Sequence, residues 1–255
     1  MLVTATSPAA VLWDMDGTLI DSEPYWMRAE HDLVEEYGGV WTHEDALQLV
    51  GQGLEHSALI LRSRGVALSV EEIVQTMTDR VTAQIRAEVP WRPGSREFLL
   101  ALREARVRTA LVTMSISRMA HLVADAIGFD AFDVVVAGDQ VEEPKPHPEP
   151  YLRAAELLGV DPRACLAFED SEPGVASAVA AGVATVAVPL HIPLPPSTAY
   201  TLWPEGLQGR VPSDLARPVA SHYTLSGYWL RSHLCLHRGK VFHCPTRNLF
   251  VLRGA

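Results

Sequence analysis

Two aspartates, Asp14 and Asp16, follow directly on the apolar run AAVLW in the stretch WDMDGTLIDSE. Carboxylates at the end of a buried strand cost free energy unless a cation or hydrogen bonds compensate their charge. Because residues i and i+2 of a strand point to the same side, the pair is predicted to converge on one point, and Gly17 permits a backbone turn beside it. An ordinary polar turn stays open as an explanation. A calcium loop is excluded, because its sixth and twelfth positions would be Leu19 and Tyr25 instead of Gly and Glu.

Three further apolar runs are followed by residues of similar chemistry. LVTMS supplies hydroxyls and backbone N–H groups that suit an anion, EEPKPHPEPY places an ammonium in a stiff loop, and LAFEDSEPG ends in two carboxylates; the residues are Thr113, Met114, Ser115, Lys145, Glu169 and Asp170. Taken alone, each has an ordinary explanation as a cap, a surface lysine or a charge at a helix terminus. Together the four strand ends predict a magnesium and phosphate site, since hard cations prefer oxygen ligands and phosphate oxygens prefer hydroxyl and ammonium donors.

The elements that must position these residues alternate between strands and helices. Strand-like apolar runs lie at residues 9–13, 107–113, 132–138, 164–168 and 183–188. Between them are stretches with apolar residues at helical spacing, and the last helix is predicted from Ser171 as N-cap to a stop at Gly182. Continuously apolar strands alternating with helices predict an α/β fold with a Rossmann-like parallel sheet covered on both faces. Ligands bind such sheets beyond the carboxyl ends of the strands.

Residues 22–90 interrupt this alternation. Four stretches with helical periodicity and no convincing strand occupy the segment, which is too long for a loop and too helical to join the sheet. The turn-rich PWRPGS then leads back to the core. We therefore predict an inserted α-helical cap at 22–90, a catalytic core formed by 1–21 and 91–215, and an atypical basic extension at 216–255.

Composition and charge narrow the class of protein and its partners. The 255 residues are 48% hydrophobic and 20% charged, which is typical of a globular protein, and no apolar run is long enough to span a bilayer. The net charge of −10 argues against nucleic acid as the main partner, and the N-terminus lacks the basic region of a signal peptide. Three cysteines make no disulfide framework, so we expect a cytoplasmic protein without a membrane or nucleic-acid partner.

The C-terminal extension differs from the rest of the chain in charge. Residues 216–255 carry six of the 21 Lys/Arg and none of the 31 Asp/Glu. Their stretch LCLHRGKVFHC is compatible with a hairpin that turns at Arg238–Lys240. A zinc site is not predicted there, because C-x-H and H-C spacing matches no standard pair of zinc ligands; the residues concerned are His233, Cys235, His237, His243 and Cys244.

The four strand-end segments together resemble the haloacid dehalogenase-like (HAD) hydrolase superfamily. DMDGTLIDSE matches the first motif of that superfamily, LVTMS the second, Lys145 in KPHPEPY the third and FEDSEPG the fourth, in family order. The resemblance covers about residues 9–190 and does not extend to the C-terminal extension. The helical insertion after the first motif looks like the smaller cap of the β-phosphoglucomutase and phosphoglycolate phosphatase-like branch.

The resemblance implies a Mg²⁺-dependent mechanism and a role for each residue. Asp14 would attack a phosphate monoester to form an aspartyl-phosphate, and Asp16 would protonate the leaving oxygen and later take a proton from the hydrolytic water. The implied magnesium ligands are Asp14, the main-chain carbonyl of Asp16 and Asp170, with Glu169 bound directly or through water. Lys145 would also assist catalysis by offsetting the charge of Asp14. The implied phosphate-binding residues are Thr113, Met114, Ser115 and Lys145.

The implied substrate is a small phosphorylated metabolite such as a sugar phosphate, because the cap would cover the crevice and close over it. A β-phosphoglucomutase-type sugar phosphomutase is the alternative. Where those mutases carry a cap histidine and a phosphate-binding arginine, this chain aligns Trp26 and Leu54, which favours a phosphatase. Tyr25 and Trp26 are close enough in sequence to reach the site, although packing inside the cap explains them equally well. A monomer, or else a homodimer, is expected.

A phosphoacceptor signalling module would use similar residues at strand ends. Such receiver domains are much shorter and lack an inserted cap. They also place the accepting aspartate after the third strand, where this chain has VVVAGD. The sequence therefore favours an enzyme over a switch.

Overall fold

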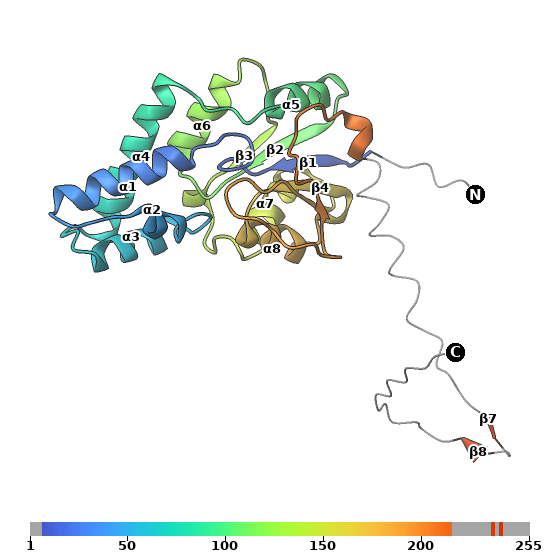
Figure 1. Cartoon of the computed structure of the whole chain (residues 1–255). Helices are drawn as coiled ribbons and strands as arrows, with labels where there is room; N and C mark the ends of the chain where they lie inside the picture. The colour runs from blue at the N-terminus through green and yellow to red at the C-terminus, as the bar shows by residue number, and fades with distance from the viewer. Residues whose placement is uncertain (1–6, 216–235, 238–239, 242–255) are drawn as a thin grey trace, which may run out of the picture.

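The computed structural model of the chain describes residues 7–215, 236–237 and 240–241 (Figure 1). The main sheet contains β1 (Ala10–Trp13), β2 (Arg108–Val112), β3 (Val134–Val136), β4 (Cys165–Glu169), β5 (Ala184–Ala187) and β6 (Thr201–Leu202). The helices beside it are α5 (Ser95–Glu104), α6 (Ser117–Ala126), α7 (Glu149–Leu158) and α8 (Glu172–Ala180). Within the described ranges, no helix combines the length and the apolar character needed to cross a bilayer.

All neighbouring strands of the main sheet are parallel, in the order β3-β2-β1-β4-β5-β6. The parallel α/β fold predicted from the sequence is therefore confirmed. β1 lies between β2 and β4, and its register places Trp13 beside both Leu111 and Phe168. The backbone N–H of Asp14 donates to the Phe168 carbonyl at 3.1 Å. This pairing brings Asp14 level with Glu169, the residue after Phe168. β6 is a strand that the apolar runs did not predict, because it has only two residues.

The two faces of the sheet bury separate apolar clusters, because the side chains of a strand alternate. Val11 and Trp13 of β1 belong to the cluster that includes α5 and α6, whereas Ala10 and Leu12 belong to the cluster that includes α7. Trp13 packs edge-on against Phe98 of α5, with ring centroids 5.9 Å apart. In Figure 1, α5 and α6 lie above the sheet and α7 and α8 below it. This burial on both sides explains why the strands are mainly apolar and do not alternate between apolar and polar residues.

Four helices lie between β1 and α5 and form a layer at one end of the sheet, at the left of Figure 1; they are α1 (Glu23–Glu36), α2 (His43–Leu47), α3 (Leu54–Ser63) and α4 (Val70–Ala87). α2 and α4 begin with capping boxes built on Thr42 and Ser69, each of which exchanges hydrogen bonds with the third helical residue. α4 packs against both α1 and α3. The predicted helices of this segment are all present, and no strand occurs within its described residues 22–90.

The junction between the α1–α4 layer and α5 is held by Arg92, whose side chain is buried. Its guanidinium donates hydrogen bonds to the backbone carbonyls of Gly17, Val188 and Pro189. These bonds join the turn after β1 to the loop after β5. A buried carbonyl without a donor costs free energy, so Arg92 stabilises three chain segments at once.

Arg92→Met is expected to lower the free energy of unfolding by about 3 kcal/mol, because these carbonyls lose their donor inside the protein. For a domain of this size, the melting temperature would fall by roughly 9 °C, which thermal unfolding followed by circular dichroism would measure. Arg62→Met on the exposed side of α3 is the matched control. An Arg92→Met protein that melts together with this control would contradict the prediction.

The C-terminal extension contains two short paired strands, which fits the hairpin that the sequence allowed, although Lys240 lies in the second strand and not in the turn. β7 (Leu236–His237) and β8 (Lys240–Val241) pair antiparallel, with His237 opposite Lys240. The intervening residues 238–239 and the rest of 216–255 lie outside the described residues, including His233, Cys235, His243 and Cys244. The absence of a zinc site therefore stays a prediction.

Candidate active site

The chain turns tightly after β1. The carbonyl of Met15 accepts a hydrogen bond from the backbone N–H of Leu19 at 2.8 Å, and Gly17 has a φ of 80°. This is the left-handed conformation that favours glycine, and a Cβ atom at Gly17 would collide with the Asp170 carboxylate. The glycine of the first motif is thus required both for the turn and for the approach of another carboxyl group.

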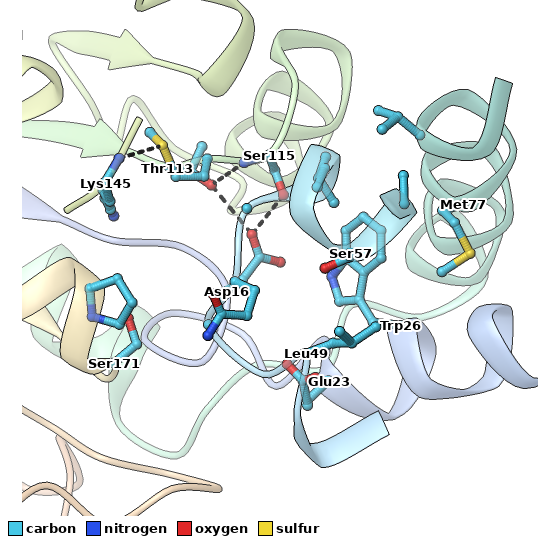
Figure 2. Close-up of a pocket in the computed structure, with 18 of the residues that line it drawn as sticks. Asp16, Glu23, Trp26, Leu49, Ser57, Met77, Thr113, Ser115, Lys145 and Ser171 are labelled. Atoms are coloured by element: carbon cyan, nitrogen blue, oxygen red, sulfur yellow. Dashed lines mark hydrogen bonds between the residues drawn. The ribbon is translucent and has the colours of Figure 1, made fainter. Parts of the chain in front are cut away.

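The two aspartates beyond β1 line the same pocket but have different hydrogen-bond partners. β1 ends before them, and the alternation of a strand no longer fixes their directions. Asp16 accepts a hydrogen bond from Ser22 at 2.5 Å. It also accepts from Ser115 at 2.7 Å and from Thr113 at 3.3 Å, and both of these bonds are drawn in Figure 2. Burial raises the pKa of Asp16, the Ser22 hydrogen bond opposes this effect, and the charge of Asp14 adds to it. A raised pKa suits a carboxyl group that must carry a proton.

Asp14 is paired with Lys145, which comes from the loop after β3. The Lys145 ammonium lies 2.7 Å from Asp14 Oδ1, 2.7 Å from Glu169 Oε1 and 2.9 Å from the Val112 carbonyl. Burial by itself would lower the pKa of Lys145, but the charges of Asp14 and Glu169 raise it above its ordinary value. Lys145 is therefore a buried, permanently charged cation between two carboxylates.

Asp14, Glu169 and Asp170 form a cluster of three buried carboxylates, called the carboxylate cluster below. One oxygen of each lies within 4.8 Å of the others. Asp14 Oδ2 and Glu169 Oε2 are buried and have no hydrogen-bond partner among the described residues, which is costly unless a cation binds them. The space beside this cluster is kept open by Gly17 and Gly174, where Cβ atoms would collide with Asp170 and Glu169. A set of oxygen ligands of this kind fits Mg²⁺.

The raised pKa values of two members of the carboxylate cluster also indicate that the site requires a cation. Burial raises the pKa of Glu169 to about 7, although the charge of Lys145 opposes the shift. Burial, followed by the charge of Asp14, raises the pKa of Asp170 well above its usual range. The Tyr151 hydroxyl donates a hydrogen bond to Glu169 Oε1 and fixes the orientation of that carboxyl group. A divalent cation would favour the ionised forms of Glu169 and Asp170.

A pocket of about 110 Å³ joins these groups to the α1–α4 layer. The side of the pocket formed by the layer is mainly apolar and includes Trp26, Leu49, Leu54, Leu61, Ile73 and Met77. Figure 2 shows Trp26, Ser57 and Met77 across the pocket from Lys145 and Thr113. The pocket is smaller than the roughly 300–1,000 Å³ typical of small-molecule sites, so it suits a small ligand.

Two acidic residues of α1 interrupt the apolar side of the pocket. Glu23, Trp26 and Glu30 are three and four residues apart, which places them on one face of α1, and all three line the pocket. Glu30 is 4% exposed and accepts a hydrogen bond from Trp41 Nε1 at 3.2 Å. Burial raises the pKa of Glu30 to about 8 and that of Glu23 to about 7, and the charge of Asp16 adds to the shift of Glu23.

The structure brings the predicted residues to this one site. The pocket is lined by Asp14, Asp16, Thr113, Met114, Ser115, Lys145 and Asp170, and Glu169 contacts Lys145. The Asp16 side chain lies outside the carboxylate cluster, so only its main-chain carbonyl remains as the ligand that the resemblance implies. Ser115, expected at a helix start, precedes the first residue of α6, Ser117.

Tyr25 and Trp26, at the start of α1, differ in their surroundings, and Trp26 also belongs to the buried core cluster. Trp26 and Leu54 line the pocket. Tyr25 is not among the described lining residues and instead donates to the Glu88 carbonyl at 3.2 Å. Four groups that support the site were not predicted from the sequence: Ser22, Tyr151, Glu23 and Glu30. A helical wheel of α1 places Glu23, Trp26 and Glu30 on one face of the helix. It does not show that this face points toward the site.

A parallel sheet with carboxylates, hydroxyls and a buried ammonium beyond its central strands is typical of enzymes that transfer or hydrolyse phosphoryl groups. The groups come from β1, β2, β4 and the loop after β3, which are neighbours in this sheet. The fold and the site thus define an enzyme of this class.

Comparison with known proteins identifies the family. The sequence profile of the haloacid dehalogenase-like hydrolases matches residues 8–182. The phosphorylated carbohydrates phosphatase of Thermotoga maritima is 33% identical over 187 residues, which cover 71% of this chain and 85% of the relative. Hexitol phosphatase B of Escherichia coli is 32% identical over 184 residues, which cover 71% and 83%. The crystal structure of β-phosphoglucomutase from Clostridium difficile shares the fold, with a TM-score of 0.73 at 19% identity over 85% of this chain and 99% of that one. The chain therefore belongs to the haloacid dehalogenase-like hydrolase family, as its four motifs predicted.

Proposed function

We propose that this protein is a Mg²⁺-dependent phosphatase that hydrolyses a small phosphorylated carbohydrate through an aspartyl-phosphate on Asp14. The observation that carries the proposal is the environment of Asp14. One carboxylate oxygen is paired with Lys145, while the other is buried in the carboxylate cluster without a hydrogen-bond partner among the described residues. The names of the two sequence relatives, which refer to phosphorylated carbohydrates and to hexitol, support the class of substrate.

In this proposal the residues of the chain divide the reaction between them. Lys145 is paired with Asp14 and holds it in place for attack on phosphorus. Asp16, held by Ser22 and Ser115, gives its proton to the leaving oxygen and then takes a proton from the water that hydrolyses the aspartyl-phosphate.

The phosphoryl group and the metal have separate ligands in this proposal. Lys145 and the hydroxyl of Thr113, with the neighbouring Met114 and Ser115, bind the phosphoryl oxygens. Mg²⁺ would be held by Asp14, the main-chain carbonyl of Asp16 and Asp170, with Glu169 as a direct or water-mediated ligand. When bound, the ion neutralises charge on the phosphoryl oxygens.

Removal of divalent cations with EDTA is expected to lower the rate of phosphate release from carbohydrate monophosphates by about 10³-fold, and added Mg²⁺ is expected to restore it. Mg²⁺ is also expected to raise the melting temperature, because it binds carboxyl oxygens that are buried without partners in its absence. The measurements are a phosphate-release assay over a panel of monophosphates and thermal unfolding with and without Mg²⁺.

Ca²⁺, which tolerates larger and less regular coordination, is the matched control cation. Phosphate release that persists undiminished in EDTA would contradict metal dependence. Interconversion of hexose 1- and 6-phosphates with little free phosphate would instead support the phosphomutase alternative.

Several expectations from the sequence stay predictions. They are the division into a core (1–21 and 91–215), a cap (22–90) and an extension (216–255), the cytoplasmic location, and the monomeric or homodimeric state. In the proposed function, the α1–α4 layer acts as the cap, since its residues form the apolar side of the pocket. Closure of such a layer would exclude water during attack by Asp14.

A further inference from the structure

The charges that line the pocket are distributed very unevenly. Five lining residues are acidic, namely Asp14, Asp16, Glu23, Glu30 and Asp170, and among the described lining residues Lys145 is the single cationic side chain. Lys145 is already paired with Asp14 and Glu169. The proposed reaction uses Lys145 and Mg²⁺ for one phosphoryl group, and no second cation in the described lining remains for another anion.

The two acidic residues on α1 are the ones that the proposed reaction does not use. Glu23 has no ion-pair partner among the described residues, and Glu30 has a single side-chain hydrogen bond there, from Trp41 to Oε2. A carboxyl group can accept hydrogen bonds from hydroxyl groups through both of its oxygens. Trp26, between them on the same face, offers an apolar ring surface against which the C–H groups of a carbohydrate can pack.

Resting on the proposed phosphatase function, we propose that Glu23, Trp26 and Glu30 form a specificity subsite that binds a neutral polyhydroxylated group and excludes substrates with a second phosphate. Hydroxyl groups would donate to the carboxyl oxygens, which gain charge-assisted hydrogen bonds in a pocket shielded from water. A second phosphate would have to leave water and lie against two acidic side chains without a counter-ion, which is strongly unfavourable. The subsite therefore restricts the phosphatase to carbohydrate monophosphates, with polyol phosphates as the best fit to a narrow pocket.

The test compares the kcat/KM values of three esters at saturating Mg²⁺ and pH 8.5, which is above the value of about 8 to which burial raises the pKa of Glu30. The esters are a hexitol 6-phosphate, a hexose 1,6-bisphosphate and p-nitrophenyl phosphate, which carries no hydroxyl groups. The native protein is expected to prefer the hexitol phosphate over the bisphosphate by about 100-fold or more.

Glu30→Gln is expected to change the two carbohydrate activities in opposite directions. Glutamine keeps the shape of the side chain and an oxygen for Trp41, but it removes the negative charge. The kcat/KM for the hexitol phosphate should fall about tenfold, mainly through KM, while that for the bisphosphate should rise several-fold. Glu23→Gln, at a half-buried position with less effect on folding, is expected to change both values in the same directions. Glu35→Gln, exposed on the same helix, has the same change of charge and should leave both values unchanged.

The outcomes separate this subsite from the proposed function. If the native protein hydrolysed the bisphosphate as efficiently as the hexitol phosphate, or if Glu30→Gln lowered both activities by the same factor, the subsite would be refuted while the phosphatase function stood. Failure to release phosphate from any of the three esters would refute the proposed function itself, and the subsite with it.

Discussion

Asp14→Asn is expected to abolish phosphate release, with a loss of about 10⁴-fold or more in kcat. The amide is not nucleophilic, and it removes the negative charge that Lys145 and the cation site hold in place. The same change removes a buried oxygen that lacks a hydrogen-bond partner among the described residues, so the fold is expected to survive it. A phosphate-release assay measures the loss, and thermal unfolding shows whether the protein remains folded.

Direct detection of the intermediate strengthens this test. Mass spectrometry of rapidly quenched native protein is expected to show one phosphoryl group on the peptide that contains Asp14, and none on the same peptide of Asp14→Asn. Asp125→Asn, on the exposed side of α6, is the matched control and should retain both activity and label. If a folded Asp14→Asn protein kept more than about 1% of the native rate, Asp14 would not be the nucleophile.

Lys145→Met is expected to lower kcat/KM by about 10³-fold, because the ammonium both orients Asp14 and binds the phosphoryl oxygens in the proposed reaction. Without the ammonium, the carboxylates of Asp14 and Glu169 lie close together in a buried site with no cation. The metal-free protein is therefore expected to lose about 3 kcal/mol of its free energy of unfolding. Activity assays and denaturant unfolding in EDTA measure the two effects.

The dependence on Mg²⁺ distinguishes an electrostatic effect from a packing defect. Mg²⁺ is expected to restore part of the lost stability of Lys145→Met but little of its activity, since the ion replaces the charge without taking the position of the ammonium. Arg153→Met, exposed on α7, is the control for loss of a cation. Equal stability of Lys145→Met and this control in EDTA would show that the buried carboxylates do not depend on the lysine.

Much of the fold is encoded in signals that are local in sequence. The strands of a sheet covered on both faces are mainly apolar, so β1 to β5 could be recognised as runs. Ser171 caps α8 by accepting from the backbone N–H of Gly174, and Gly182 has a φ of 78° just beyond the helix, as the sequence predicted. The two-residue β6 carries no such signal and was missed.

The sequence could predict which residues make up the candidate site, but not how their side chains are arranged. Parallel strands bring their carboxyl ends to one edge, which explains why Asp14, Lys145 and Asp170 could be placed together from the sequence alone. The directions of side chains beyond the last strand residue depend on tertiary contacts. For that reason the turn after β1 sends Asp16 toward Ser22 and Ser115, which no strand rule could indicate.

The residues of the α1–α4 layer illustrate a second limit. An acidic residue on a helix is usually on the solvent face, and Glu30 has the same local sequence signature as an exposed glutamate. Its burial is set by Trp41 and by the packing of α1 on α4, which are remote in sequence. Only the assembled structure shows that this glutamate lines the pocket.

The sheet order separates two kinds of residue along the chain. The groups proposed for bond making and breaking follow strands at the centre of the sheet, whereas those proposed to choose the substrate belong to an inserted helix that contributes nothing to the sheet. Substitutions on the pocket-lining face of α1 can therefore accumulate, and new substrates be acquired, with little disturbance to the reaction centre. The function of this protein can therefore diverge through substitutions on that one helical surface.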